Sequence, residues 1–365
     1  MTTTKIHLTE TMFTETERVF LENEAFKVSL FRYASGVNAV RLENSVLSLI
    51  VLPFHGQQVW RFAYKNRDLT MKSIFDQPQD TDRFGLNYGA HLIHCGLTAS
   101  GNPSPEDSHP LHGELPNCKY QQAWLILDMD QENPQLAMGG CFTFRNSLEY
   151  HYTFEPNLIL RKDASIVDVE IRAANLRQKP MKYMYMAHIN WLPVEKSKLI
   201  SSMARESVEV FSDTFGLPNA EQQKFLDYVS QLQQDPELAD QIDSASQVLD
   251  PELCLYMRML ADEKGFAHAL QVFPEGDADY VSFRVNELPN AVRWYARTGD
   301  EDALAFAIPS TNNHLGFSRN LAKGLIREIP AKGCITMSYR FGYIEKQAAE
   351  QLIEKVNRIK AAQLS

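Results

Sequence analysis

Cysteine is scarce in this 365-residue sequence, and the few residues present do not pair in spacing. They are Cys95, Cys118, Cys141, Cys254 and Cys334, an odd number with no Cys-x-x-Cys motif. Disulfide frameworks and zinc ribbons both need paired cysteines, so the sequence argues against either. We expect a protein of the reducing cytoplasm.

Long hydrophobic runs are also missing. The longest mainly apolar stretch, Val46–Phe54, is far shorter than the roughly 20 residues that a membrane-spanning helix needs. The N-terminal segment has neither the apolar core nor the small-residue cleavage site of a secretory signal. The sequence therefore predicts neither membrane insertion nor export.

Basic residues are outnumbered by acidic ones. Lysine and arginine total 36 against 46 aspartate and glutamate residues, which gives a formal net charge of -10. No basic cluster with interleaved aromatic residues is present, so nucleic-acid binding is not expected. Hydrophobic residues make up 44% of the chain, enough for a substantial core at this length.

The signature motifs of several enzyme classes are absent as well. The chain has no GxGxxG or GxxxxGK(S/T) phosphate-binding loop, no GxSxG elbow and no HExxH helix. Nucleotide binding, hydrolysis by a nucleophilic serine and zinc proteolysis therefore have little support. We expect no cofactor and no resident metal ion.

What the sequence does have is alternation between apolar and polar residues. It runs through residues 25–65 and 122–193, and turn formers interrupt it. The clearest case places Val167, Val169 and Ile171 on one face of a strand and charged residues on the other. Many strands with few helices predict an all-β fold, a large β-sandwich.

Two stretches depart from this alternation. Residues 219–248 are rich in Gln, Glu, Asp, Leu and Ala, with apolar residues at helical spacing, which predicts a short helical insertion of one or two helices. Residues 344–363 have the pattern of an amphipathic C-terminal helix. No solenoid repeat, low-complexity tract or flexible linker is present, so we expect residues 1–365 to form a single domain.

Histidine is concentrated between residues 83 and 117. Four of the ten histidines, His91, His94, His109 and His112, fall there, in a stretch crowded with glycine and proline. Such a stretch is a loop held by flanking strands, and loops on rigid scaffolds often carry polar chemistry. A surface loop that merely contains histidines explains the pattern equally well.

Two further histidine features leave alternatives open. His91 and His94 could share a metal ion on a helix, but on the strand that GAHLIHCGL predicts they would point to opposite faces. In MKYMYMAHINWLP, His188 and Asn190 share one face of an otherwise apolar row. A buried hydrogen-bonded pair and the lining of a site both explain that placement.

Four short motifs occur in an order that resembles a known family. HCGL, PLHGELPN, AHINW and ELPNAVRW together resemble motifs of the aldose 1-epimerases, in the galactose mutarotase-like superfamily, and more specifically a mostly uncharacterised bacterial branch. The resemblance covers about residues 25–345. It implies a β-supersandwich with a sugar site on its concave face, and therefore a monosaccharide or sugar derivative as ligand. We expect a monomer or weak dimer.

The resemblance also implies the reaction and the residues that perform it. The reaction is the interconversion of sugar anomers by acid/base ring opening, without a cofactor. His112 matches the histidine that contacts the sugar near its anomeric centre, and His188 matches the histidine that acts as the acid on the ring oxygen. The residues expected to bind the sugar are Arg83, His91, His94, Asn190 and Trp294.

One position departs from the family. Its catalytic glutamate falls at Ile308, and the nearby TGDED segment has the composition of an exposed turn. Glu114, close to His112, is our candidate for the base, although an ordinary loop glutamate would look the same.

Two other functions stay open: a non-catalytic sugar-binding or sensing protein on the same fold, and a metal-assisted sugar isomerase that uses His91 or His94 with His112 and Glu114.

Overall fold

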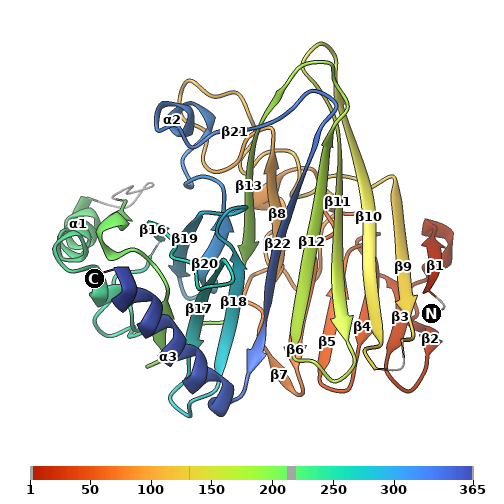
Figure 1. The fold of residues 1–365 in the computed structure, drawn as a ribbon, viewed down its shortest axis with the longest axis horizontal. Helices are drawn as coiled ribbons and strands as arrows, with labels where there is room; N and C mark the ends of the chain where they lie inside the picture. Colours follow the sequence, from red (N-terminus) through yellow and green to blue (C-terminus); the bar gives the residue numbers. More distant parts are fainter. Residues whose placement is uncertain (1–2, 131, 212–218, 251, 364–365) are drawn as a thin grey trace.

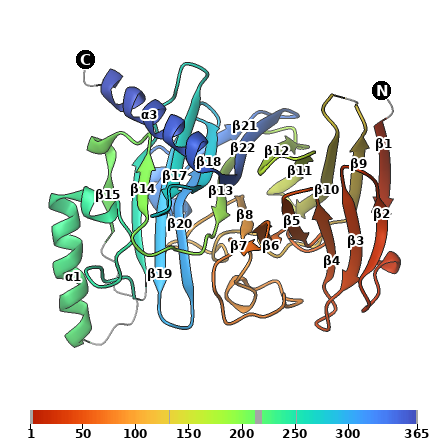
Figure 2. The same cartoon turned by 90° about the horizontal axis from the view of Figure 1, so that it is seen from below.

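Two large antiparallel β-sheets face each other and make up most of the molecule (Figures 1 and 2). The computed structural model describes residues 3–130, 132–211, 219–250 and 252–363. The nine-stranded sheet contains, in order, β1 (Thr3–Leu8), β9 (Gln122–Asp128), β10 (Gln135–Asn146), β11 (Tyr150–Arg161), β12 (Ile166–Asn175), β22 (Cys334–Ile344), β18 (Ala278–Arg284), β17 (Phe266–Val272) and β14 (Lys198–Ser201).

The second sheet has thirteen strands and carries the site described below. In order they are β15 (Glu209–Val210), β16 (Leu253–Arg258), β19 (Asn290–Arg297), β20 (Asp302–Ser310), β13 (Met181–Ile189), β8 (Leu92–Leu97), β6 (Val59–Tyr64), β5 (Leu47–Val51), β4 (Asn38–Glu43), β3 (Lys27–Arg32) and β2 (Arg18–Glu22), with β7 (Arg67–Asp68) beside β6 and β21 (Arg327–Ile329) beside β13. The prediction of a large all-β sandwich is confirmed.

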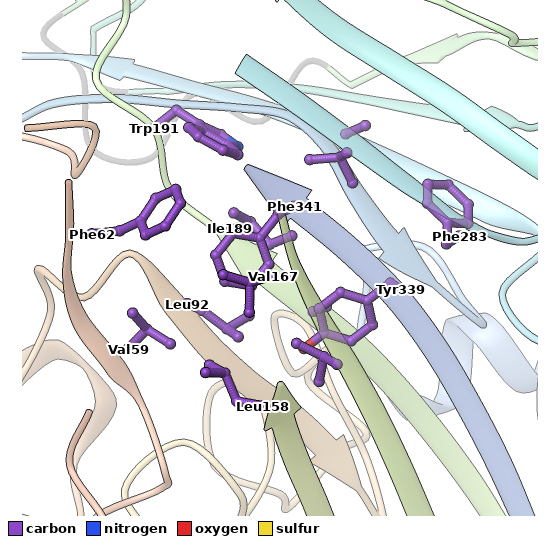
Figure 3. Close-up of a cluster of buried hydrophobic side chains, with 14 of the residues drawn as sticks. Val59, Phe62, Leu92, Leu158, Val167, Ile189, Trp191, Phe283, Tyr339 and Phe341 are labelled. Atoms are coloured by element: carbon purple, nitrogen blue, oxygen red, sulfur yellow. The ribbon is translucent and has the colours of Figure 1, made fainter. Parts of the chain in front are cut away.

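The main core lies between the sheets. Figure 3 shows Phe62 and Leu92 of the thirteen-stranded sheet facing Val167 and Phe341 of the nine-stranded sheet. The Phe62 and Phe341 rings meet edge to face, with centroids 5.2 Å apart. The predicted alternation in β12 holds, because its apolar face is buried here. Each such side chain contributes roughly 1.5–3 kcal/mol when fully buried.

The helices are shorter than the sequence pattern predicted. The insertion predicted at 219–248 is helical only in α1 (Asn219–Gln234) and in a 3-10 turn, Pro236–Ala239. Pro236 cannot continue α1, and Asp235 instead caps the turn by accepting a hydrogen bond from the Glu237 backbone N–H. Within 240–248 the described chain contains no helix.

The C-terminal helix is α3 (Lys346–Gln363). It begins later than the predicted start at residue 344, because that residue still belongs to β22. Its Ala349 and Val356 pack on the outer face of the nine-stranded sheet (Figure 2). A short helix that the sequence did not predict, α2 (Phe317–Ala322), follows β20. Short 3-10 turns occur at Glu10–Met12, Phe84–Leu86 and Arg205–Ser207. Among the described helices, none is both long and apolar enough to span a membrane.

The outer face of the thirteen-stranded sheet has a second apolar cluster, which positions the site. Met186 of β13, Trp294 of β19 and Ile308 of β20 belong to it. Phe84 and Tyr88 pack against the cluster from the segment that joins β7 to β8, which loops away from the sheet in Figure 2. Strands on one side and this loop on the other therefore enclose a space between them.

Candidate functional site

A cavity of about 390 Å³ opens between the thirteen-stranded sheet and the loops that cover it. Its lining combines aromatic, histidine and carboxylate side chains. The lining residues are Phe84, Tyr88, Asn102, Leu111, His112, Met186, His188, Glu252, Cys254, Val292, Trp294, Glu301, Ile308 and His314. A mostly apolar wall with a few polar groups is typical of small-molecule sites.

His112 and His188 meet in this cavity although they are far apart in the sequence. Their ring centroids are 5.4 Å apart and the rings are perpendicular. His112 has a left-handed backbone (φ 61°), as does Gly113 (φ 82°). A Cβ added to Gly113 would lie 2.1 Å from the Ala99 carbonyl oxygen, so only glycine fits there. This tight turn holds the His112 ring over the sheet.

His188 reaches the cavity from β13. Met186, two residues earlier, also lines the cavity, as strand alternation requires. The Nδ1 atom of His188 lies 2.7 Å from Oδ1 of Asn190. Of the two explanations that the sequence left open, the structure shows the buried hydrogen-bonded pair, and it also places His188 in the lining of a cavity.

Both histidines are neutral near pH 7. Burial lowers the pKa of His188 from 6.5 to about 4, and the hydrogen bond to Asn190 offsets part of that effect. Burial also lowers the pKa of His112 well below its ordinary value, and the neighbouring His188 lowers it further. A neutral imidazole accepts a proton at one nitrogen and donates one at the other.

Trp294 and Tyr88 form an aromatic corner beside His188. The ring of Trp294 lies 5.4 Å from that of His188, and the ring of Tyr88 lies 5.9 Å from Trp294 and 6.0 Å from His188. The Trp294 indole N–H donates a hydrogen bond of 2.6 Å to Oε2 of Glu252. The corner therefore joins an apolar surface to a carboxylate.

The sequence analysis missed the two carboxylates of the cavity. Glu252 lies just before β16, and Glu301 lies in the turn between β19 and β20. Asp300 is exposed, as TGDED suggested, but Glu301 is half-buried. Burial raises the pKa of Glu301, and the charge of Asp300 raises it further. His314, Phe84 and Tyr88 were missed too, since only the fold shows which loop residues turn inward.

Glu114, the predicted base, is outside this cavity. Its Oε1 accepts hydrogen bonds from the backbone N–H groups of Leu97 (3.1 Å) and Thr98 (2.9 Å), and also from the Tyr152 hydroxyl. Its Oε2 accepts the Thr98 hydroxyl at 2.7 Å. Burial raises the pKa of the Glu114 carboxyl despite these bonds. It borders a separate hollow of about 740 Å³.

His91 and His94 also lie away from the cavity, in the core between the sheets. The His91 ring is 4.7 Å from Phe62 and 4.5 Å from Trp191. Nδ1 of His94 bonds the Tyr185 hydroxyl at 2.7 Å. The prediction that these two histidines point to opposite faces is wrong, because His91 occupies a bend before β8 rather than the strand itself.

The remaining predicted residues have different surroundings. Arg83 is exposed, and its neighbour Phe84 lines the cavity in its place. Asn190 is fully buried behind His188. Within the described part of the chain, no group of three His, Cys, Asp or Glu side chains is placed to hold a metal ion. The histidines and Glu114 that the metal-assisted alternative requires are thus divided between the core, the cavity and the separate hollow.

Comparisons with known proteins agree with this architecture. A family model described as a domain of unknown function (DUF4432) matches residues 34–341. No curated protein matches the chain. The structure of a provisionally named aldose 1-epimerase from Klebsiella pneumoniae subsp. pneumoniae MGH 78578 has a TM-score of 0.83 at 13% identity, over 98% of this chain and 96% of that one.

Two other solved structures are similar over most of their length. A galactose mutarotase-like protein from Clostridium acetobutylicum has a TM-score of 0.58 at 13% identity, over 88% of this chain and 99% of that one. A provisionally named aldose 1-epimerase from Escherichia coli K12 has a TM-score of 0.56 at 12% identity, over 84% and 99%. At such identities the likeness shows a shared fold, which is galactose mutarotase-like.

Proposed function

We propose that this chain, which belongs to the DUF4432 family, binds a monosaccharide in its cavity and interconverts the anomers of that sugar. One observation carries the proposal: two neutral histidines face each other in an aromatic-walled cavity. The cavity, at about 390 Å³, falls in the range of roughly 300–1,000 Å³ that is usual for small-molecule sites. The fold shared with provisionally named aldose 1-epimerases agrees with this proposal.

The chemistry needs only proton transfers. Ring opening of a pyranose removes a proton from the anomeric hydroxyl and supplies one to the ring oxygen, and ring closure on the other face reverses both steps. Neutral imidazoles suit such transfers, and His112 and His188 are close enough to approach one sugar together. No cofactor is needed for this reaction.

Sugar recognition follows from the same lining. The faces of Trp294 and Tyr88 offer apolar surface for the C–H groups of a sugar ring, while Glu252 and Glu301 accept hydrogen bonds from its hydroxyls. Arg83, exposed beside the cavity wall, is a proposed contact for outer hydroxyls. We further propose that residues 1–365 act as a single domain, as a monomer or weak dimer, in the cytoplasm.

Glu114 is proposed to hold the loop rather than to react. Replacing Glu114 by Leu removes the oxygen that accepts the backbone N–H groups of Leu97 and Thr98. We expect the free energy of unfolding to fall by about 1–3 kcal/mol, because buried donors lose their partner. Urea denaturation measures this. The anomerisation rate of the folded variant should stay within a few-fold of wild type, and a large loss of rate would restore Glu114 as the base.

A non-catalytic sugar-binding protein is the second candidate, and Ile308 favours it. Ile308 lines the cavity where the family places a carboxylate, and it cannot transfer a proton. Magnetisation exchange between the two anomers, measured by NMR on a panel of common aldoses with catalytic amounts of protein, separates the candidates. Accelerated exchange supports the enzyme. Binding without acceleration supports the sensor, and neither effect with any aldose contradicts both.

A further inference from the structure

We propose that His188 is the base of the reaction, taking the proton from the anomeric hydroxyl and delivering it to the ring oxygen, and that Asn190 is the positioning residue that keeps Nε2 of His188 ready to accept it. This inference rests on the proposed function. It differs from the role that the family resemblance implies, in which His188 starts as the acid.

The tautomer of His188 follows from a chain of hydrogen bonds. The Asn190 side-chain NH2 donates to the Ala90 carbonyl oxygen at 2.9 Å, which fixes the orientation of the amide. The opposite orientation would bring two acceptor oxygens together. Oδ1 of Asn190 therefore faces Nδ1 of His188 at 2.7 Å, and an acceptor there requires an N–H on Nδ1.

The backbone of Asn190 is held as firmly as its side chain. Its N–H donates to the His91 carbonyl oxygen at 2.7 Å, and its own carbonyl oxygen accepts the Met71 N–H at 3.2 Å. The Tyr88 hydroxyl, at 3.4 Å, also approaches Oδ1. The backbone bonds hold Asn190 in place, and turning its side-chain amide would break the bonds to Ala90 and to the Tyr88 hydroxyl, so Nδ1–H is fixed.

A neutral imidazole carries only one N–H. With Nδ1 protonated, Nε2 keeps its lone pair, and the ring lines the cavity. Burial favours the neutral form, with a pKa of about 4. The other titratable side chains that line the cavity are Tyr88, His112, Glu252, Cys254, Glu301 and His314. Near pH 7 His188 is thus a proton acceptor, not an imidazolium acid.

A single histidine can complete the reaction because both oxygens are bonded to the same carbon. Nε2 takes the proton from the anomeric O–H, the C1–O bond of the ring breaks with its electron pair going to the ring oxygen, and C1=O forms. The imidazolium then gives the same proton to the ring oxygen. Rotation about C1–C2 and the reverse steps give the other anomer, so protons and electrons balance without a co-reactant.

Two of the neighbouring carboxyl groups are already engaged in hydrogen bonds. Glu252 shares the cavity but has one oxygen bound to the Trp294 indole. Glu114 uses both oxygens in hydrogen bonds outside the cavity. Ile308 has only a hydrocarbon side chain at the position that matches the catalytic glutamate of the aldose 1-epimerases. His188 is therefore the acceptor whose orientation the structure fixes most completely, and an imidazole replaces the missing carboxylate.

The tautomer can be measured without any sugar. In a long-range ¹⁵N–¹H NMR spectrum of the histidine-labelled protein at pH 7, His188, assigned from the signals that His188→Gln lacks, should be neutral with its proton on Nδ1. A signal of the Nε2–H tautomer, or of an imidazolium, would overturn the inference. This readout does not depend on whether the protein acts on sugars.

The pH profile of kcat/KM tests the role itself. For wild type we expect a plateau above about pH 6 and a fall as the pH drops towards 4, because protonation of a base stops it from accepting a proton. Rates that fall as the pH rises through neutrality would indicate an acid and overturn the inference. The two carboxylates of the cavity could also cause the fall of kcat/KM at low pH, and Asn190→Asp distinguishes them from His188. A carboxylate beside Nδ1 raises the pKa of His188, so the acid limb of the profile should move to higher pH by about 1–3 units.

Matched variants complete the test. Asn190→Leu leaves Nδ1–H without an acceptor and should lower kcat by about 10-fold or more, with sugar KM changed little. Asn146→Asp adds the same charge at an exposed site on β10 and should keep the wild-type profile. An acid limb that does not move in Asn190→Asp overturns the role of His188 alone, whereas a wild type without anomerisation overturns the proposed function and this role together.

Discussion

Replacing His188 by Gln should lower the rate of anomerisation by about 10²–10⁴-fold, the usual cost of removing a general base. Glutamine keeps a polar group of similar reach but has no nitrogen that accepts a proton near neutral pH. Its amide can still bond Asn190, so the buried Asn190 keeps a partner and the fold should survive. Anomer exchange at saturating sugar measures the rate, and circular dichroism checks the fold.

A matched control is available in the other sheet. His151 lies on β11, and His151→Gln makes the same chemical change at a residue that does not line the cavity. It should keep the wild-type rate. If His188→Gln were as active as wild type, the proton would have to move through another group, and His112 would be the first to examine.

Acidification from pH 7 to pH 5 should lower the free energy of unfolding by roughly 4 kcal/mol through His91 and His94 alone. Burial lowers the pKa of each from 6.5 to about 3. Below pH 6.5 the unfolded chain binds a proton at each ring and the folded chain does not. The stability is therefore complete above pH 6.5 and is lost progressively as the pH falls towards 3. At pH 5 each ring accounts for about 2 kcal/mol of the loss in the free energy of unfolding.

His91→Leu isolates one of these protons. The His91 ring lies among Phe62, Trp191 and Phe341, and an interaction with the Asn190 backbone offsets only part of the lowering of its pKa by burial. Leucine suits those neighbours and does not titrate. Urea denaturation between pH 5 and 8 should show a loss on acidification about 2 kcal/mol smaller than in wild type. An unchanged pH dependence would mean that His91 is not the buried neutral group described here.

Strand patterns made much of this fold predictable. Alternation in residues 25–65 and 122–193 marked strands of both sheets, and the row of side chains on β13 grouped His188 with Met186, which also lines the cavity. The helical spacing of apolar residues predicted too long a helical insertion at 219–248, because that spacing does not show that Pro236 ends α1. Periodicity describes regular elements well and their ends poorly.

The differences between the predicted and the observed positions of the site residues have a common physical cause. Glu114 seemed close to His112 because only one residue separates them, yet His112 and Gly113 both have positive φ, which sends the chain after them away from the cavity. Glu252 and Glu301 could not be found because they lie at a strand end and in a turn. Side-chain direction there depends on tertiary packing, which no periodicity reports.

A crystal structure with a bound monosaccharide tests the central claim most directly. The account predicts a pyranose in the cavity against Trp294, with its anomeric oxygen and ring oxygen both near Nε2 of His188, at least one of them at a hydrogen-bonding distance of about 2.6–3.2 Å. Asn190 should keep its bond to Nδ1. A sugar bound only elsewhere, or bound in the cavity with its anomeric carbon turned away from His188, would contradict it.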